Sequence, residues 1–163
     1  MALGHINHIC LTVKDGKQAY EFYSPVLEYL GYKPVFFKGF WRRPDPEIGD
    51  FALFEARPEF SDRNHERRAP GLHHLAFNAD SREQVDGLYE VLVKIGAKIL
   101  DPPQEVYGSS YYAVYFEDPD GVKLELAYTP NGTYSYAMEH QKGERWKEKG
   151  RYAAPVLPDG TVG

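Results

Sequence analysis

Two histidines have the type and spacing that metal chemistry needs: His8 in the stretch HINHICLTV and His74 in the stretch GLHHLAFNA, 66 positions further along. Each lies in an alternation of polar and apolar residues, which indicates a half-buried strand. Side chains in a strand alternate between its two faces. Ile9, Leu11 and Val13 share the apolar face, so His8 lies on the other, and the same parity applies to His74. Equivalent positions on equivalent faces favour a common chemical role.

Glu125 is the third candidate. It lies in the stretch GVKLELAY at 121–128, whose apolar residues alternate and put Glu125 on the face that does not pack. A carboxylate facing the interior of a curved sheet is costly unless it is paired or bound to a cation. Two imidazoles and one carboxylate form a ligand set suited to Fe(II), Mn, Zn, Ni or Co, with positions left open for substrate or water. We therefore predict one divalent metal ion held by His8, His74 and Glu125.

The elements that must position these residues occur twice. Each copy has a strand, an amphipathic helix and further strands, which predicts an α+β fold of two βαβββ modules. The predicted parts are a first module at 1–58, a linker at 59–70, a second module at 71–128 and a C-terminal tail at 129–163 with one short helix. In the first module the later strands are expected at 33–42 and 50–56, and in the second at 110–117 and 121–128.

Turn residues mark the ends of these elements. Gly31 and Gly96 follow the two helices at the position where a left-handed cap is wanted. Pro25 lies inside the first helix, where it removes a backbone donor, so a kink or restart is expected there. The stretch DPDG at 118–121 predicts a hairpin turn, with proline fixing one φ angle and glycine supplying a positive one.

Composition excludes several classes of function. The net charge of −5 and the pI near 5.7 argue against a nucleic-acid surface, which needs a basic stripe. The single cysteine excludes an intrachain disulfide framework and a cysteine-based zinc cluster. No window approaches the roughly 18 apolar residues of a membrane span, so no membrane partner is expected. The start MALGHINHIC lacks the features of a signal peptide, and a cytoplasmic location is expected.

Four stretches, NHICLTVKD, FYSPVLEYLGY, HHLAFNADS and DPDGVKLEL, resemble the vicinal oxygen chelate superfamily. It includes glyoxalase I, fosfomycin-resistance transferases, bleomycin-binding proteins and extradiol dioxygenases. The resemblance covers residues 5 to 128. It implies that the two modules form a cupped, incomplete mixed β-barrel flanked by helices, with His8, His74 and Glu125 around a divalent ion. It also implies a small substrate bound through vicinal oxygens, and a homodimer in which modules pair across the subunits.

Glyoxalase-like members of that superfamily add a fourth ligand from the last strand of the first module. Counting from Gly49 as from Gly121 to Glu125 leads to Leu53, which cannot bind a metal. Glu55 could serve there only if the strand is bulged or shifted. Leu53 at this position favours a three-ligand site, as in dioxygenase-like or transferase-like arrangements. A glutamate partly displaced from the metal, Glu125 or Glu55, could act as a catalytic base.

Tyr111, Tyr115 and Arg42 are the candidates for substrate binding. The tyrosines have two interpretations: strand packing, which aromatic residues favour, or a cavity wall whose phenol hydrogen-bonds a substrate oxygen. Arg42 is either a solvated charge or one member of a clamp for an anionic substrate. Both alternatives stay open at the level of sequence.

The leading functional hypothesis is a divalent-metal-dependent enzyme that acts as a Lewis acid on a small oxygen-chelating substrate, with glyoxalase-like lyase or isomerase activity or a detoxification activity. The first alternative is an extradiol-type Fe(II) dioxygenase, which would consume oxygen with catechols. The second is a non-catalytic protein that binds a small molecule such as an antibiotic, and its binding would survive a chelator.

Overall fold

The computed structural model describes residues 3–35, 37–44, 49–106 and 109–130. The chain divides into two compact units, Met1–Pro130 and Asn131–Gly163. The short helix predicted for the tail lies outside the described residues. Among those residues, no helix is both long enough and apolar enough to cross a membrane.

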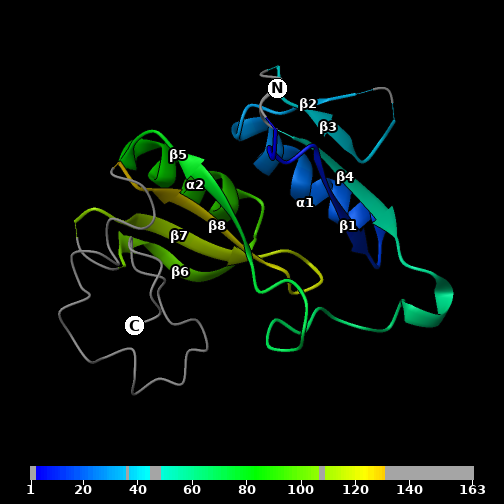
Figure 1. Ribbon diagram of the computed structural model, residues 1–163. Helices are drawn as coiled ribbons and strands as arrows, with labels where there is room; N and C mark the ends of the chain where they lie inside the picture. Colours follow the sequence, from blue (N-terminus) through cyan, green and yellow to red (C-terminus); the bar gives the residue numbers. More distant parts are fainter. Residues whose placement is uncertain (1–2, 36, 45–48, 107–108, 131–163) are drawn as a thin grey trace, which may run out of the picture. The chain divides into compact units, whose positions relative to one another are not determined.

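Both modules of the predicted α+β fold are present in the first unit (Figure 1). The first consists of β1 (His8–Val13), α1 (Gly16–Tyr29), β2 (Lys33–Pro34), β3 (Phe40–Arg42) and β4 (Asp50–Glu55). A short 3-10 helix, η1 (Pro58–Phe60), opens the connection to the second module. That module consists of β5 (Leu75–Ala79), α2 (Arg82–Lys94), β6 (Lys98–Glu105), β7 (Tyr112–Glu117) and β8 (Lys123–Tyr128).

Each module forms its own four-stranded mixed sheet. The strand orders are β1-β4-β3-β2 and β5-β8-β7-β6, so the two sheets repeat one topology. β1 runs parallel to β4, and β5 runs parallel to β8, while the other neighbours are antiparallel. The two sheets are separate and do not close into a barrel within the chain, which agrees with the predicted cupped, incomplete arrangement.

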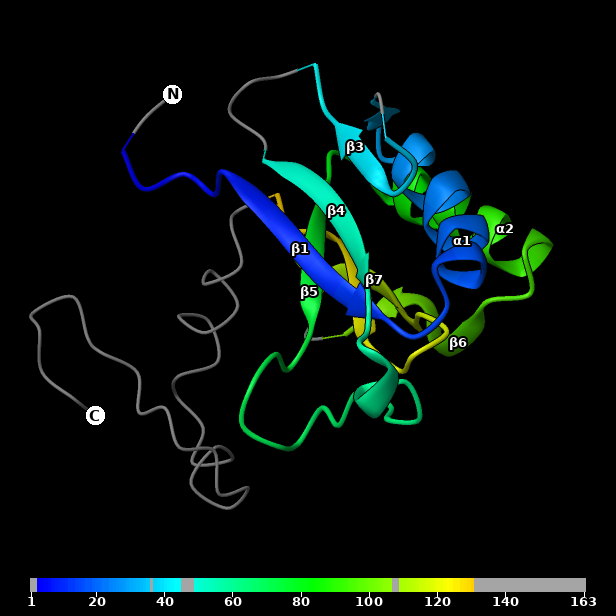
Figure 2. The same ribbon diagram turned by 90° about the vertical axis from the view of Figure 1, so that its right-hand side faces the viewer.

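One face of each sheet packs under a helix. α1 and α2 lie side by side, as both views show (Figure 2), and the hydroxyl of Tyr29 donates to the Gln84 carbonyl across this contact at 2.9 Å. Both helices bury an apolar stripe against the sheets, in one shared core. In β1 and β5 exposure alternates residue by residue, with the odd-numbered residues toward the core. This confirms the strand parity that placed His8 on the open face.

Capping residues and glycines mark the ends of both helices, as the sequence predicts. Asp15 caps α1 by accepting from the Gln18 N–H at 2.9 Å, and Ser81 caps α2 in the same way. Gly31 and Gly96 follow the helices with φ of 85° and 68°. The expected restart at Pro25 does not occur, because α1 continues through this residue as one helix to Tyr29.

β6 is a strand that the sequence pattern did not indicate. It contains Pro102 and Pro103, which cannot donate to a ladder, and it therefore lies at the sheet edge. Its pairing with β7 shifts register between Ile99 and Asp101 and again between Asp101 and Gln104. The prolines interrupt the alternation that would otherwise reveal the strand.

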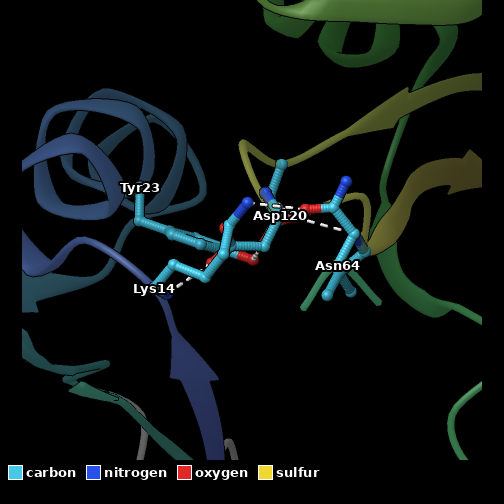
Figure 3. A network of polar contacts seen from close by, with 6 residues as sticks. Lys14, Tyr23, Asn64 and Asp120 are labelled. Atoms are coloured by element: carbon cyan, nitrogen blue, oxygen red, sulfur yellow. Dashed lines mark hydrogen bonds and ion pairs between the residues drawn. The ribbon is translucent and has the colours of Figure 1, made fainter. Parts of the chain in front are cut away.

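The DPDG turn between β7 and β8 joins the two modules (Figure 3). The Tyr23 hydroxyl on α1 donates to the Asp118 carboxylate at 2.8 Å, in a buried setting. Asp120 accepts from the Lys14 N–H at 2.8 Å, and the Lys14 ammonium donates to Asn64 in the connecting segment. Burial raises the pKa of Asp118, and burial together with the charge of Asp118 raises the pKa of Tyr23. A turn that the sequence marks only as a hairpin therefore also holds the modules together.

Candidate metal centre

Glu125 is the centre of the candidate site. It lies in β8 with only 1% of its surface exposed. Its two carboxylate oxygens have different neighbours: Oε1 accepts a hydrogen bond from the Tyr111 hydroxyl, and Oε2 lies 3.2 Å from Nε2 of His74. The structure therefore brings two of the three predicted metal ligands, His74 and Glu125, into contact.

The His74 ring is held from its other side. Its Nδ1 lies 2.7 Å from Nδ1 of His73, so one of the two rings donates to the other and Nε2 is left toward Glu125. Burial lowers the pKa of His73, and the positive charges of His74, Arg67, Lys123 and Arg68 act in the same direction. His73 is exposed and is thus not a core residue of the helix-packing face, but a neighbour that orients a predicted ligand.

The donor atoms of His74 and Glu125 suit a divalent ion. Imidazole nitrogen and carboxylate oxygen bind such ions at roughly 2.0–2.2 Å, so two ligands at about a right angle lie roughly 3 Å apart. The 3.2 Å between Nε2 and Oε2 matches this separation. A metal-bound histidine usually hydrogen-bonds through its second nitrogen, as His74 does to His73.

His8 does not join these two residues within one chain. It is exposed at the start of β1, where its Nδ1 lies 2.7 Å from Oδ1 of Asn7 and its backbone is paired with Asp50. Among the described residues, no three histidine, cysteine, aspartate or glutamate side chains come together to hold a metal ion. Within the described part of one chain, His8 therefore does not form a three-ligand site with His74 and Glu125. His8 belongs to the first sheet and Glu125 to the second.

Arg42 is engaged by a carboxylate. Its guanidinium donates to both oxygens of Asp50 at 2.7–3.2 Å. The hydrogen bond from Arg42 lowers the pKa of Asp50, and the charges of Arg42 and His8 add to the effect against the opposing influence of burial. Since β3 pairs with β4 so that Arg42 is opposite Asp50, the arginine lies on the open face that carries His8. Its substrate-binding role stays a prediction.

Glu55 lies on the opposite face of β4 from Asp50. Its register partner is Val13, a core residue, and its Oε1 accepts from the Gly16 N–H at 3.2 Å at the start of α1. There it borders a cavity of about 350 Å³ on the helix side of the sheet. The structure therefore does not bring Glu55 to His8, and its local contact is to the positive end of α1.

Ala52 occupies the position in the first sheet that Glu125 occupies in the second. Cys10 pairs with Ala52 in the same way as Ala76 pairs with Glu125. Counting from glycine misplaced this position at Leu53, because the first module has one residue fewer between the glycine and the paired strand. Ala52 cannot bind a metal, so the first module offers no fourth ligand at this position.

The two predicted substrate-binding tyrosines lie around Glu125. Tyr111, Ala113, Tyr115 and Ala127 form a buried cluster on this face of the second sheet, apart from the main core. Tyr115 is the register partner of Glu125, and the Tyr111 hydroxyl contacts its carboxylate. Both tyrosines therefore pack, which is the first of their two interpretations. Tyr111 also positions the carboxylate of Glu125.

Lys123 is a residue of this face to which the sequence pattern gave no role. Its ammonium lies 3.8 Å from the centre of the Tyr115 ring, two residues before Glu125 on the same side of β8. Burial lowers the pKa of Lys123, as does the charge of Arg67, whereas the carboxylates of Glu125, Asp101 and Glu117 raise it. Strand parity places this lysine on the same face of β8 as the predicted ligand, and the structure agrees.

Comparison with known proteins supports the resemblance. The family model described as the glyoxalase/bleomycin resistance protein/dioxygenase superfamily matches residues 5–126. The uncharacterized protein YqjT of Bacillus subtilis is 33% identical over 126 residues, covering 74% of this chain and 96% of its own. A metallothiol transferase FosB from Shouchella clausii is 28% identical, covering 83% and 85%.

Among solved structures, a glyoxalase/bleomycin resistance protein/dioxygenase domain from Frankia sp. EAN1pec is similar to this chain. It aligns with a TM-score of 0.65 and 27% identity, over 78% of this chain and 99% of that domain. The match of the family model covers both modules and the residues of the candidate site. The chain therefore belongs to the glyoxalase/bleomycin resistance protein/dioxygenase superfamily.

Proposed function

We propose that the protein is a divalent-metal-dependent enzyme of the detoxification type, acting on a small substrate that presents oxygen atoms to the metal. The observation that carries the proposal is the pair formed by His74 Nε2 and Glu125 Oε2, 3.2 Å apart with the carboxylate buried. A buried carboxylate beside an imidazole is a donor set suited to Zn, Mn, Ni, Co or Fe(II).

The third ligand in this proposal is His8 of a second copy of the chain. Two observations support it: His8 does not reach Glu125 within its own chain, and the face of β1 that carries it is exposed. The resemblance to a superfamily whose modules pair across dimers supports the same arrangement. The site would then lie between the first sheet of one protomer and the second sheet of its partner.

The chain's own residues would prepare this site in two ways. Tyr111 holds Oε1 of Glu125, which leaves Oε2 toward His74. With its proton on Nδ1, toward His73, His74 would present an unprotonated Nε2 to the same point. A divalent ion bound there would act as a Lewis acid and stabilise negative charge that develops on a substrate oxygen.

Thiol transfer is the reaction we favour. A relative named metallothiol transferase matches most of the chain, and Ala52 supplies no second carboxylate for an isomerase reaction at the position equivalent to Glu125. In such a transfer the thiol sulfur forms a bond to a substrate carbon, and the bond between that carbon and oxygen breaks. The departing oxygen takes up the proton that the thiol gives up, so that no oxidant or reductant is needed.

Metal analysis tests the site. Protein purified without added ions and then titrated with Zn²⁺ or Mn²⁺ should bind about one ion per chain. His74→Ala and Glu125→Ala should each lower this affinity at least tenfold, because removing one of three ligands leaves an incomplete site. Losing only the hydrogen-bond partner of a metal ligand already lowers metal affinity by about tenfold or more. His5→Ala, which changes another exposed histidine near the start of the chain, should leave the affinity unchanged. Full metal binding by the His74 or Glu125 variant would rule out the proposed ligands.

An activity assay tests the reaction. Metal-loaded protein should consume free thiol when it is given L-cysteine or glutathione together with small epoxides, which carry oxygen on an electrophilic carbon. Oxygen uptake with catechols by the iron-loaded protein would instead indicate the dioxygenase alternative. Tight binding of a small molecule that persists after chelation would indicate a binding protein. Either of the last two results, without thiol consumption, would contradict thiol transfer.

A further inference from the structure

The residue before each proposed histidine ligand contacts the Nδ1 atom of that ligand. Oδ1 of Asn7 lies 2.7 Å from Nδ1 of His8, and Nδ1 of His73 lies 2.7 Å from Nδ1 of His74. Asn7 and His73 are 66 positions apart, the same offset as between His8 and His74. The two modules therefore repeat one local arrangement with different side chains, and the sequence pattern gave no role to Asn7.

The position of Asn7 before the first strand makes this contact possible. Neighbouring side chains inside a strand point to opposite faces and do not meet. β1 begins at His8, so Asn7 precedes the regular strand and its side chain can contact the histidine ring. In the second module, His73 and His74 both precede β5 in the same way.

The backbone of Asn7 is fixed by the first sheet. The Asp50 N–H donates to the Asn7 carbonyl at 3.0 Å, next to the register pair of His8 and Asp50. Gly49 approaches so closely that a Cβ atom there would lie 2.9 Å from the same carbonyl oxygen, which is closer than such atoms pack. The amide that contacts His8 is therefore carried by a backbone that is already paired with β4.

An asparagine oxygen determines the tautomer of the ring that it contacts. Oδ1 of Asn7 can only accept a hydrogen bond, so Nδ1 of His8 carries the proton and donates it. In a neutral imidazole the other nitrogen, Nε2, then has its lone pair free for a metal ion. His73 places no such constraint on His74, because an imidazole nitrogen can donate or accept.

We infer that Asn7 is a positioning residue, which orients the His8 ring and fixes Nε2 as the nitrogen that binds the metal. This inference rests on the proposed function, in which His8 is the ligand from a second copy of the chain. Hydrogen-bond partners of this kind fix the ring orientation and the tautomer of metal-bound histidines. Without Asn7, the exposed His8 ring would be free to rotate and to carry its proton on Nε2, and ordering it would oppose metal binding.

The tautomer of His8 in the metal-free, full-length chain is the first test. Long-range proton–nitrogen NMR spectra of protein with isotope-labelled histidine are recorded at about pH 8, where free imidazole is neutral. The unaltered protein should carry the His8 proton on Nδ1. Asn7→Ala should populate the tautomer with the proton on Nε2, whereas Asn7→Asp, which retains an acceptor oxygen, should keep it on Nδ1. Asn64→Ala is the matched control, because the Asn64 oxygen accepts from the Lys14 ammonium instead.

Metal affinity is the second test. Asn7→Ala should weaken Mn²⁺ binding by about tenfold, the effect of removing a hydrogen-bond partner from a metal ligand. Asn7→Asp should bind Mn²⁺ at least as tightly as the unaltered protein, and Asn64→Ala should bind it equally tightly. A merely structural role for Asn7 would leave the His8 proton on the same nitrogen in every variant.

Four results would overturn the inference: a His8 proton on Nε2 in the unaltered protein, an unchanged tautomer in Asn7→Ala, unchanged Mn²⁺ affinity in Asn7→Ala, or the same loss of affinity in Asn64→Ala. Failure of the proposed function has a different signature. In that case the unaltered protein carries the His8 proton on Nδ1 and yet binds no Mn²⁺.

Discussion

Glu125, the proposed metal ligand, has each of its two carboxylate oxygens held by a different neighbour. One carboxylate oxygen is occupied by the Tyr111 hydroxyl and the other faces His74 at 3.2 Å. A buried carboxylate that kept both oxygens free could turn or bind an ion through both of them. The hydrogen bond from Tyr111 therefore limits the carboxylate to one orientation. The Tyr111 side chain that makes this bond is itself buried.

Replacing Tyr111 with phenylalanine tests this role. Tyr111→Phe should weaken Zn²⁺ or Mn²⁺ binding about tenfold, the effect typical of removing a hydrogen-bond partner of a metal ligand. Tyr112→Phe is the matched control, because its hydroxyl donates to Asp86 of α2 at 2.8 Å, away from Glu125. Isothermal titration of both variants gives the comparison, and thermal unfolding confirms that each is folded. Equal metal affinity in Tyr111→Phe and the unaltered protein would show that Tyr111 only packs.

At the residue scale, strand parity was enough to place His8 and Glu125 on the faces of their strands that do not pack under a helix, and His74 directly before β5 beside Glu125. Counting from a glycine did not find the residue equivalent to Glu125, because the spacing from a glycine does not fix the pairing register. A difference of one residue between Gly49 and β4 moves every side chain to the other face, and Ala52 takes the place that counting had assigned to Leu53.

At the scale of elements, the turn between β7 and β8 determines how the modules are joined. Asp118 accepts from the Tyr23 hydroxyl and from two backbone N–H groups of its own turn, so one carboxylate both shapes the hairpin and anchors α1. Sequence alone could predict the hairpin from proline and glycine. It could not predict the anchor, since that depends on which helix face reaches the turn.

Removing the Tyr23 hydroxyl should destabilise the fold. Tyr23→Phe is expected to lower the free energy of unfolding by about 2 kcal/mol, because a hydrogen bond to a buried charged group is lost. Tyr20→Phe on the same helix is the control: its ring stacks on Trp41, and its hydroxyl makes no hydrogen bond among the described residues, so a change below about 0.5 kcal/mol is expected. Urea unfolding curves measure both. Equal stabilities of the two variants would mean that the contact between Tyr23 and Asp118 contributes nothing.

The helices and β6 show why some elements can be predicted from local sequence signals and others cannot. Asp15, Ser81 and the glycines after each helix are local signals, and they act as the sequence indicates. A kink or restart was expected at Pro25, yet α1 continues through it as one helix with a buried apolar stripe on both sides. Tertiary packing offsets the missing hydrogen bond there. β6 is the reverse case, since its prolines hide a strand that the neighbouring β7 supports.

At the scale of the whole molecule, the repeat in the sequence predicted two modules of one topology, and the two sheets confirm it. The repeat could not show whether His8 meets the other ligands in its own chain or in another. Each sheet is complete with the strands of its own module, so the fold leaves the open face of the first sheet, with His8 and the Arg42–Asp50 pair, unused by the second. In the proposed arrangement, that face meets the second sheet of another copy of the chain.

Mixing two inactive variants tests this account most directly. His8→Ala and Glu125→Ala should each bind Mn²⁺ at least tenfold more weakly when alone, because every site in either homodimer lacks a ligand. After the two are unfolded together and refolded, random pairing gives heterodimers in about half of the molecules, each with one intact site, or roughly a quarter of a site per chain. The predicted result is that Mn²⁺ titration of the mixture shows metal binding regained at that level. A mixture that binds no more Mn²⁺ than its separate components would contradict a metal site shared between two chains.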